Sequence, residues 1–260
     1  MTTDTWNPVQ YEKFQREREQ PFVDLLAMIR PAPGMRSVDL GCGTGKLTRD
    51  LHERLDAGET IGLDRSARML AAQDGAQLPP GLSFTNETIE SFLQRDGTFD
   101  LIFSNAVFHW IEDHPALLAK LARRLAPGGQ LAFQVPAMHG DPSHLVADAL
   151  SAEEPFVSAL GGWRRANTVL TPDEYSRLLF RLGFESPRTC LVVYPHVLAD
   201  RDAVVEWVKG TLLAEYEKHM PATLFARFVE EYRERLLPRF EDTRPFFYPF
   251  KRVLCWGQRA

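Results

Sequence analysis

The sequence predicts an α/β protein built on a doubly wound, mainly parallel sheet. Two observations support this fold class. Short apolar runs alternate with segments of helical periodicity, and the first run ends in a glycine-rich turn that leads directly into a helix. Strands separated by helices at this spacing form parallel sheets, with right-handed crossovers that place helices on both faces. The predicted strands of this part of the chain are 36–40, 60–64, 82–85, 99–104 and 130–135.

The helices of this region follow from apolar periodicity and from breaking residues. We expect an N-terminal helical segment over 8–29, broken at Pro21 and ended by the proline and glycine residues of 31–34. Three further helices are predicted between the strands, and the third is stopped by the Pro-Gly-Gly turn at 127–129. They are 45–55, 66–73 with Ser66 as its N-cap, and 115–125.

After residue 136 the alternation gives way to helices. Helical periodicity covers 141–154, 172–182 and 203–240, and two more strands are expected at 188–194 and 249–256. The long helical stretch has no place in a plain sheet layer. We therefore expect it to form a cap over the strand ends, where ligands bind in sheets of this kind.

Composition excludes several classes of protein. The chain has 260 residues, of which 44% are hydrophobic and 25% charged, and its formal net charge of -5 argues against a general nucleic-acid-binding surface. No apolar run approaches the roughly 20 residues of a membrane span, and the polar N-terminus does not resemble a signal peptide. The three cysteines are scattered, which argues against a disulfide framework or a zinc site and favours a cytoplasmic protein without a metal.

The strongest chemical signal is the segment 39–45, Asp-Leu-Gly-Cys-Gly-Thr-Gly. Glycine at 41, 43 and 45 permits a sharp turn and a close approach of the backbone to a ligand. A nicotinamide dinucleotide site is the alternative, but its fingerprint is GxGxxG and an acid at Asp39 would repel a pyrophosphate. Asp39 suits an ammonium group instead, and S-adenosylmethionine carries one. We predict a site for that cofactor around Asp39, Gly41, Cys42, Gly43 and Gly45.

Residues at the ends of the next strands complete this prediction. Asp64 ends the second strand and is expected to accept both ribose hydroxyls; the alternative is a helix cap. Arg65 lies beside it, and Met69 is expected to pack on the adenine face. Glu87 or Thr88 is expected to accept from the adenine amino group, unless this segment is a solvated turn.

The end of the fourth strand supplies the remaining cofactor candidates. Backbone carbonyls at Ser104 and Asn105 are expected to take the ammonium of the cofactor. His109 and Trp110 either border the methyl group or pack beneath the cap.

Taken together, these residues resemble the class I S-adenosylmethionine-dependent methyltransferases. The segment 39–45 resembles their first motif, Asp64 their second, and 125–131 the turn leading to their fifth strand. The resemblance covers about residues 36–135. It implies a Rossmann-like sheet of seven strands, with the last strand antiparallel.

A narrower resemblance, to the trans-aconitate 2-methyltransferase group, spans nearly the whole chain. It rests on Trp6-Asn-Pro, Asn105-Ala-Val-Phe-His-Trp110, Gly161-Gly-Trp163, Val205-Glu-Trp-Val-Lys-Gly-Thr211 and Tyr248-Pro-Phe-Lys-Arg252. It implies that the N-terminal helix closes over the cofactor, with Tyr11 and Arg18 in the site and Arg18 on the cofactor carboxylate. The implied domains are a lid over 1–30, a cofactor-binding core over 31–136, and a remainder over 137–260 with the cap at about 137–170 and 200–240.

Two positions depart from the pattern of that group. Thr88 stands where the group usually has Asp, so its hydroxyl or nearby backbone must recognise adenine. Segment 211–216 lacks the Arg that a polycarboxylate would require, which argues against trans-aconitate itself. The many aromatic residues after 150 favour an organic acid with a hydrophobic part, or a secondary metabolite. The predicted acceptor site is Trp110, Gln134, Trp163, Tyr194, His196, Trp207 and Lys209.

The predicted reaction is methyl transfer to a small molecule, and the leading hypothesis is O-methylation of a carboxylate. A carboxylate needs no base, only a cation to hold it, and Arg164, Arg165, Lys209 and Arg252 are candidates. His109 and Tyr11 are the predicted catalytic residues and act by positioning. A hydroxyl, nitrogen or carbon acceptor is the alternative, with His109, His139 or His196 as base. A nicotinamide-dependent oxidoreductase and a non-catalytic binding protein are more remote alternatives, and a monomer or homodimer is expected.

Overall fold

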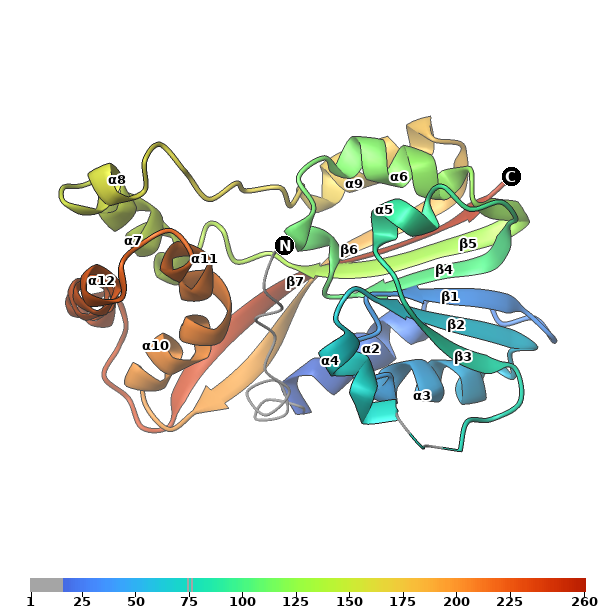
Figure 1. Ribbon diagram of the computed structural model, residues 1–260, viewed down its shortest axis with the longest axis horizontal. Coiled ribbons are helices and arrows are strands. Elements are labelled where there is room, and N and C mark those ends of the chain that lie inside the picture. The colour runs from blue at the N-terminus through green and yellow to red at the C-terminus, as the bar shows by residue number, and fades with distance from the viewer. Residues whose placement is uncertain (1–15, 74, 76) are drawn as a thin grey trace. The chain divides into compact units, whose positions relative to one another are not determined.

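A single seven-stranded sheet organises the chain (Figure 1). The computed structural model describes residues 16–73, 75 and 77–260, with side chains from Glu19 onward. The strand order is β3-β2-β1-β4-β5-β7-β6. Strands β1 to β5 pair in parallel, whereas β7 runs antiparallel to β5. The predicted fold class is therefore confirmed. The strands are β1 (Arg36–Leu40), β2 (Glu59–Asp64), β3 (Leu82–Asn86), β4 (Phe99–Asn105), β5 (Leu125–Pro136), β6 (Phe184–Leu198) and β7 (Phe246–Arg259).

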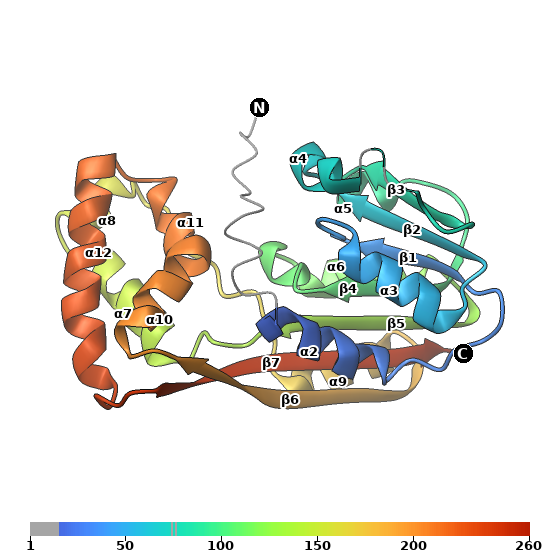
Figure 2. The same ribbon diagram turned by 90° about the horizontal axis from the view of Figure 1, so that it is seen from below.

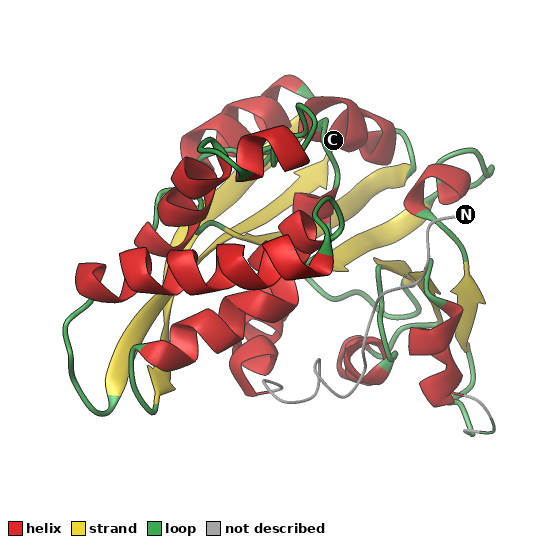
Figure 3. Ribbon diagram, turned by 60° about the vertical axis from the view of Figure 1, so that its left-hand side comes forward, coloured by secondary structure: helices red, strands yellow, loops and turns green. Residues whose placement is uncertain are grey.

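Helices cover both faces of this sheet, as Figures 2 and 3 show. Helices α2 (Arg16–Leu26) and α3 (Lys46–Leu55) lie on one face, and α6 (His114–Ala122) and α9 (Pro172–Arg181) lie on the other. The central strands are buried on both sides; Val38, Leu101 and Phe133, for example, are fully buried. Burial on both faces accounts for the continuous apolar runs in these strands.

The chain divides into two compact units. The first comprises 1–136, 168–192 and 252–260, and the second comprises 137–167 and 193–251. The second unit contains most of the predicted cap helices and has its own aromatic core, in which the rings of Phe156 and Phe228 meet edge to face at 5.0 Å. Its helices are α7 (Pro142–Ser151), α8 (Phe156–Ala159), α10 (Asp202–Val208), α11 (Ala214–Glu217) and α12 (Ala222–Leu236).

The predicted elements are wrong in three main respects. Helix α2 continues through Pro21, because the burial of Phe22 and Leu25 keeps the helix packed where the proline removes one amide donor. Residues 127–129 do not form a simple stop before a strand; β5 already begins at Leu125, and 126–129 form an irregularity in its pairing with β4. The stretch 203–240 is divided by a π-helical turn at Lys209–Leu213 and by Pro221.

Two properties of the described residues bear on function. Within this part of the chain, no helix combines the length and the apolar character that a membrane crossing requires. Over the same residues, no group of three or more His, Cys, Asp or Glu side chains is arranged to hold a metal ion.

Candidate functional site

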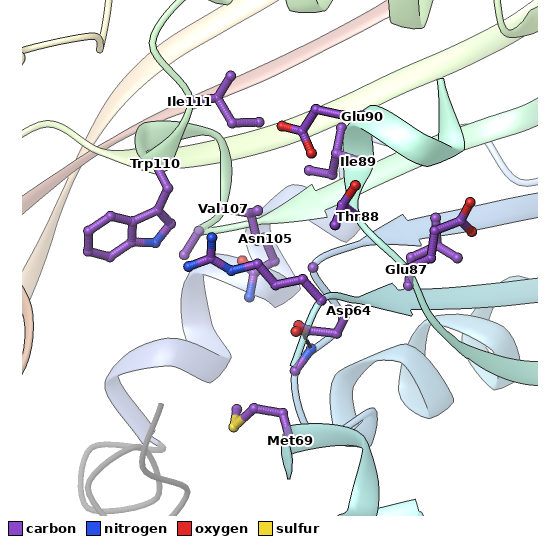
Figure 4. A pocket seen from close by; sticks show the side chains of 15 residues that line it. Asp64, Met69, Glu87, Thr88, Ile89, Glu90, Asn105, Val107, Trp110 and Ile111 are labelled. Carbon is purple, nitrogen blue, oxygen red and sulfur yellow. Dashed lines mark hydrogen bonds between the residues drawn. The ribbon is translucent and has the colours of Figure 1, made fainter. Parts of the chain in front are cut away.

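A pocket opens at the carboxyl ends of β1, β2 and β4 and at the loop after β3 (Figure 4). This edge is where ligands bind in open parallel sheets. Nine predicted site residues line it: Gly41, Gly43, Asp64, Arg65, Met69, Glu87, Thr88, Asn105 and Trp110. It also contains six residues that the sequence analysis did not single out: Leu63, Ile89, Glu90, Ala106, Val107 and Ile111.

The glycine loop is shaped by close contacts. Gly41 has φ of 78°, and a Cβ there would lie 2.3 Å from Cγ2 of Val107. Gly45 is the N-cap of α3 with φ of 75°, and a Cβ there would lie 2.6 Å from the ring of Phe84. Since neither position accepts a side chain without displacement, the loop brings bare backbone to the pocket.

Cys42 contributes backbone rather than a thiol to this loop. It is absent from the pocket lining, and its Sγ lies 3.1 Å from where a Cβ on Gly62 of β2 would be. Its amide donates to the carbonyl of Leu63 at 2.9 Å. Burial, with the charges of Asp39 and Asp64, raises the pKa of the thiol, so Cys42 does not act as a thiolate.

Asp39 lies beneath the loop as a buried acid. Oδ2 accepts a hydrogen bond from the Thr48 hydroxyl at 2.6 Å, while Oδ1 has no hydrogen-bond partner among the described residues. Burial raises the pKa of this carboxyl to about 7, and the charge of Asp64 adds to the effect, although the Thr48 bond opposes it. A cation close to Oδ1 would favour the ionised form.

Asp64 is fixed by two backbone amides. Oδ2 accepts from the amide of Gly43 and Oδ1 from the amide of Ser66, both at 2.8 Å. The helix that follows, α4 (Ala67–Leu70), has Ser66 as its N-cap, with the amide of Met69 donating to Oγ. The alternative that Asp64 caps this helix is therefore wrong, and Asp64 instead belongs to the lining of the pocket.

Glu87 and Thr88 have different environments. The Glu87 carboxylate lies 2.5 Å from the Arg95 guanidinium, and Figure 4 shows it directed away from Asp64. Thr88 is the N-cap of α5 (Ile89–Phe92), and its hydroxyl accepts from the amide of Ser91 at 3.2 Å. The Thr88 hydroxyl thus keeps a proton to donate and a second lone pair toward the pocket.

The segment after β4 forms the far wall. Ser104 is fully buried and donates to the carbonyl of Leu40 at 2.9 Å, so its side chain joins β4 to β1 rather than lining the pocket. Ala106 has φ of 60°, a backbone conformation uncommon for a residue with a side chain. His109 does not line the pocket; its ring packs at 4.5 Å against Trp110, which does.

The missed lining residues had weak sequence signals. Leu63 and Val107 look like ordinary apolar residues, and Ala106 gives no sign of its positive φ. Ile89 and Ile111 follow predicted site residues directly, so their adjacency was the available signal. Tyr11 lies outside the described residues, as does the side chain of Arg18 in α2.

Most predicted acceptor residues belong to the second unit, where they form two clusters. His196 stacks on Phe250 at 4.7 Å and meets Trp207 at 4.5 Å, and Tyr194 is also buried. Trp163 stacks on His219 at 4.2 Å. Lys209 pairs with Glu206 at 2.6 Å near the surface.

Two further candidates already have fixed hydrogen bonds. Arg165 binds Asp148 through two donors, at 3.1 and 2.8 Å. Gln134 is 1% exposed in the first unit and reaches the pocket only through Asn105.

Known proteins resemble this chain over most of its length. The methyltransferase domain family matches residues 38–133. The trans-aconitate 2-methyltransferase of Deinococcus radiodurans is 43% identical over 98% of both chains. This chain belongs to the trans-aconitate 2-methyltransferase family. The enzyme of the same name from Variovorax paradoxus is 36% identical over 89% of this chain and 88% of its own. Among solved structures, the YcgJ protein from Bacillus subtilis has the same fold, with a TM-score of 0.61 and 17% identity over 93% of this chain and 99% of its own.

Membership of this family makes the chain an S-adenosylmethionine-dependent methyltransferase. The residues at the pocket also fit that cofactor chemically. Asp39 provides a buried carboxylate oxygen without a partner among the described residues, next to a loop that excludes side chains. Asp64 provides a fixed acceptor, and Met69 and Ile89 provide apolar surface. The predicted cofactor is therefore confirmed, while the individual residue roles stay predictions.

Proposed function

We propose that this enzyme methylates a carboxylate of a small organic acid, either trans-aconitate or a more hydrophobic acid. The observation that carries the proposal is the 43% identity over 98% of the chain to an enzyme named for trans-aconitate. A carboxylate is already ionised at neutral pH and needs no proton removed.

The reaction balances without an acid or a base. The cofactor supplies an electrophilic methyl group on a sulfonium centre. An acceptor oxygen gives its electron pair to the methyl carbon as the carbon–sulfur bond breaks, and the sulfur retains that bonding pair. The products are a methyl ester and S-adenosylhomocysteine. The protein has to bind both reactants, align them and exclude water.

The residues of the first unit are assigned to the cofactor. Asp64 accepts the ribose hydroxyls, and Thr88 with nearby backbone contacts the adenine edge. Asp39 favours a nearby ammonium, and Met69 packs on the base. Tyr11 and Arg18 complete the site from the N-terminal lid. Within this proposal Glu87 contributes its backbone, because its carboxylate is paired with Arg95.

The acceptor is assigned to the end of the pocket at Trp110. The acceptor roles of the second-unit residues stay predictions; these are Trp163, Tyr194, His196, Trp207 and Lys209. The lid over 1–30, the core over 31–136 and the cap within 137–260 stay our proposed organisation. We further propose a cytoplasmic enzyme, in line with three scattered cysteines, acting as a monomer or homodimer on a small molecule rather than a nucleic acid.

Methyl-labelled cofactor and a panel of acids test this function. Trans-aconitate and more hydrophobic mono- and dicarboxylic acids are incubated with the enzyme, and the product is treated with mild base. Release of the label as methanol identifies an ester. A base-stable product would indicate a hydroxyl, nitrogen or carbon acceptor instead. Binding of NAD without binding of S-adenosylhomocysteine would contradict the proposal entirely.

A further inference from the structure

A chain of hydrogen bonds joins a buried cation to the pocket across three neighbouring strands. Arg252 of β7 is 4% exposed, and its Nη1 donates to Oε1 of Gln134 on β5 at 3.1 Å. Nε2 of Gln134 then donates to Oδ1 of Asn105, at the end of β4, at 2.6 Å. The strand register permits this, because Gln134 pairs with Asn105 on one side and β7 lies on the other.

The cation fixes the direction of both amides. A guanidinium has only donors, so Gln134 must turn its oxygen toward Arg252. The amide nitrogen of Gln134 consequently faces Asn105, which must present its own oxygen. The remaining group of Asn105, the NH2 of its amide (Nδ2), is therefore directed away from Gln134. The orientation of both side-chain amides therefore follows from the donors of Arg252, and it does not depend on how the oxygen and nitrogen of each amide were assigned.

The amide Nδ2 of Asn105 is available to donate a hydrogen bond to a ligand. Asn105 is half-buried and lines the pocket, and Figure 4 shows its amide on the same side of the pocket as the Asp64 carboxylate. No described residue accepts a hydrogen bond from Nδ2. Along the sheet edge, the order β3-β2-β1-β4 places the Thr88 loop at one end and Asn105 at the other. If adenine lies at Thr88, Asn105 lies toward the amino-acid tail and the reacting methyl.

We propose that Asn105 donates through Nδ2 to a carboxylate oxygen at this end of the pocket, and that Gln134 and Arg252 are positioning residues that hold the amide in this orientation. The proposal rests on the proposed function, since both the amino-acid tail of the cofactor and the acceptor bring a carboxylate there. A donor polarised by a buried cation suits an anion better than a neutral ligand.

Two isosteric substitutions test the relay. Asn105→Asp replaces the donor by an acceptor without changing its size. Gln134→Glu keeps the bond to Arg252 but offers Asn105 an acceptor, so the Asn105 amide turns and presents Oδ1 to the pocket. Gln134 does not line the pocket, so an equal effect of both substitutions identifies the relay. Gln258→Glu is the matched control, on β7 and hydrogen-bonded to Arg30 and Gly128 away from the pocket.

Calorimetry of each variant compares S-adenosylhomocysteine with methylthioadenosine, which lacks the amino-acid tail. If the relay binds the tail, Asn105→Asp and Gln134→Glu each lower the affinity for S-adenosylhomocysteine by about tenfold or more and leave the affinity for methylthioadenosine unchanged. If it binds the acceptor, both nucleoside affinities stay unchanged. The KM for trans-aconitate then rises about tenfold or more, with a smaller change in kcat.

Other results overturn the proposal. Variants that match the Gln258→Glu control in every measurement would show that Nδ2 binds no carboxylate. An equal loss for both nucleosides would indicate general damage to the pocket. If the wild type forms no methyl ester with any acid, the proposed function fails. The affinities for S-adenosylhomocysteine and methylthioadenosine then decide alone. If their ratio is the same in both variants as in the wild type, the relay is overturned too.

Discussion

Asp64 has two tasks in this structure, and removing it should affect both. Its carboxylate accepts from the amides of Gly43 and Ser66, so it fixes the glycine loop and the turn into α4 while facing the pocket. Asp64→Ala removes both bonds and the acceptor for the ribose. A hydrogen bond to a charged group is worth about 1.5 to 3 kcal/mol. The affinity for S-adenosylhomocysteine should fall by about 10- to 150-fold.

A graded series separates ligand binding from stability. Asp64→Asn keeps one acceptor oxygen, so one of the two amides stays bonded and the loss of affinity should be intermediate. Asp100→Ala is the matched control, because the Asp100 carboxylate accepts from the amide of Arg36 at 2.8 Å, at the opposite end of β1. It should lower the melting temperature without altering affinity.

The measurements are titration calorimetry with S-adenosylhomocysteine and thermal unfolding of each variant without ligand. The reasoning fails if Asp64→Ala binds the nucleoside as tightly as Asp100→Ala does. It also fails if the affinities of the Ala and Asn variants at position 64 are equal to that of the wild type while both melt lower. In that case the carboxylate would only hold the loop.

Four further predictions concern the side chains of Asp39, Thr88 and Tyr216. Because the pKa of buried Asp39 is raised to about 7, the wild type should lose stability as pH rises from about 4 through 7, and Asp39→Asn should not. S-adenosylhomocysteine affinity should rise over pH 5.5 to 8 in the wild type and stay flat in Asp39→Asn; parallel profiles would argue against an ammonium near this acid. Thr88→Asp should retain the cap of α5 and bind S-adenosylhomocysteine more tightly, because a carboxylate is the stronger acceptor for the adenine amino group; a weaker complex in calorimetry would place adenine elsewhere. Tyr216→Phe should lower the free energy of unfolding in denaturant by about 1.5 to 3 kcal/mol through the lost bond to the Asp148 carboxylate, and an unchanged midpoint would show that this bond contributes nothing.

The sequence determined the features that depend on local backbone geometry and on strand order. Glycines between a strand and a helix fixed the position of the loop, and Asp64 ends the neighbouring strand. Parallel pairing of β1 with β2 brings the ends of these strands together, so their chemistry could be predicted without coordinates. The alternation of strands and helices predicted the parallel part of the sheet, whereas the count of seven strands with an antiparallel last strand was implied by the resemblance to class I methyltransferases.

Only the tertiary structure decided how the polar side chains are used. Glu87 and Thr88 are neighbours in sequence, yet the Glu87 carboxylate pairs with Arg95 while the Thr88 hydroxyl caps helix α5. Asn105, Gln134 and Arg252 lie far apart along the chain and become a relay only when three strands align. Hydrogen bonds have short range and strict direction, so residue types alone do not reveal which donor meets which acceptor. That pairing depends on register and packing between distant segments, which no local pattern encodes.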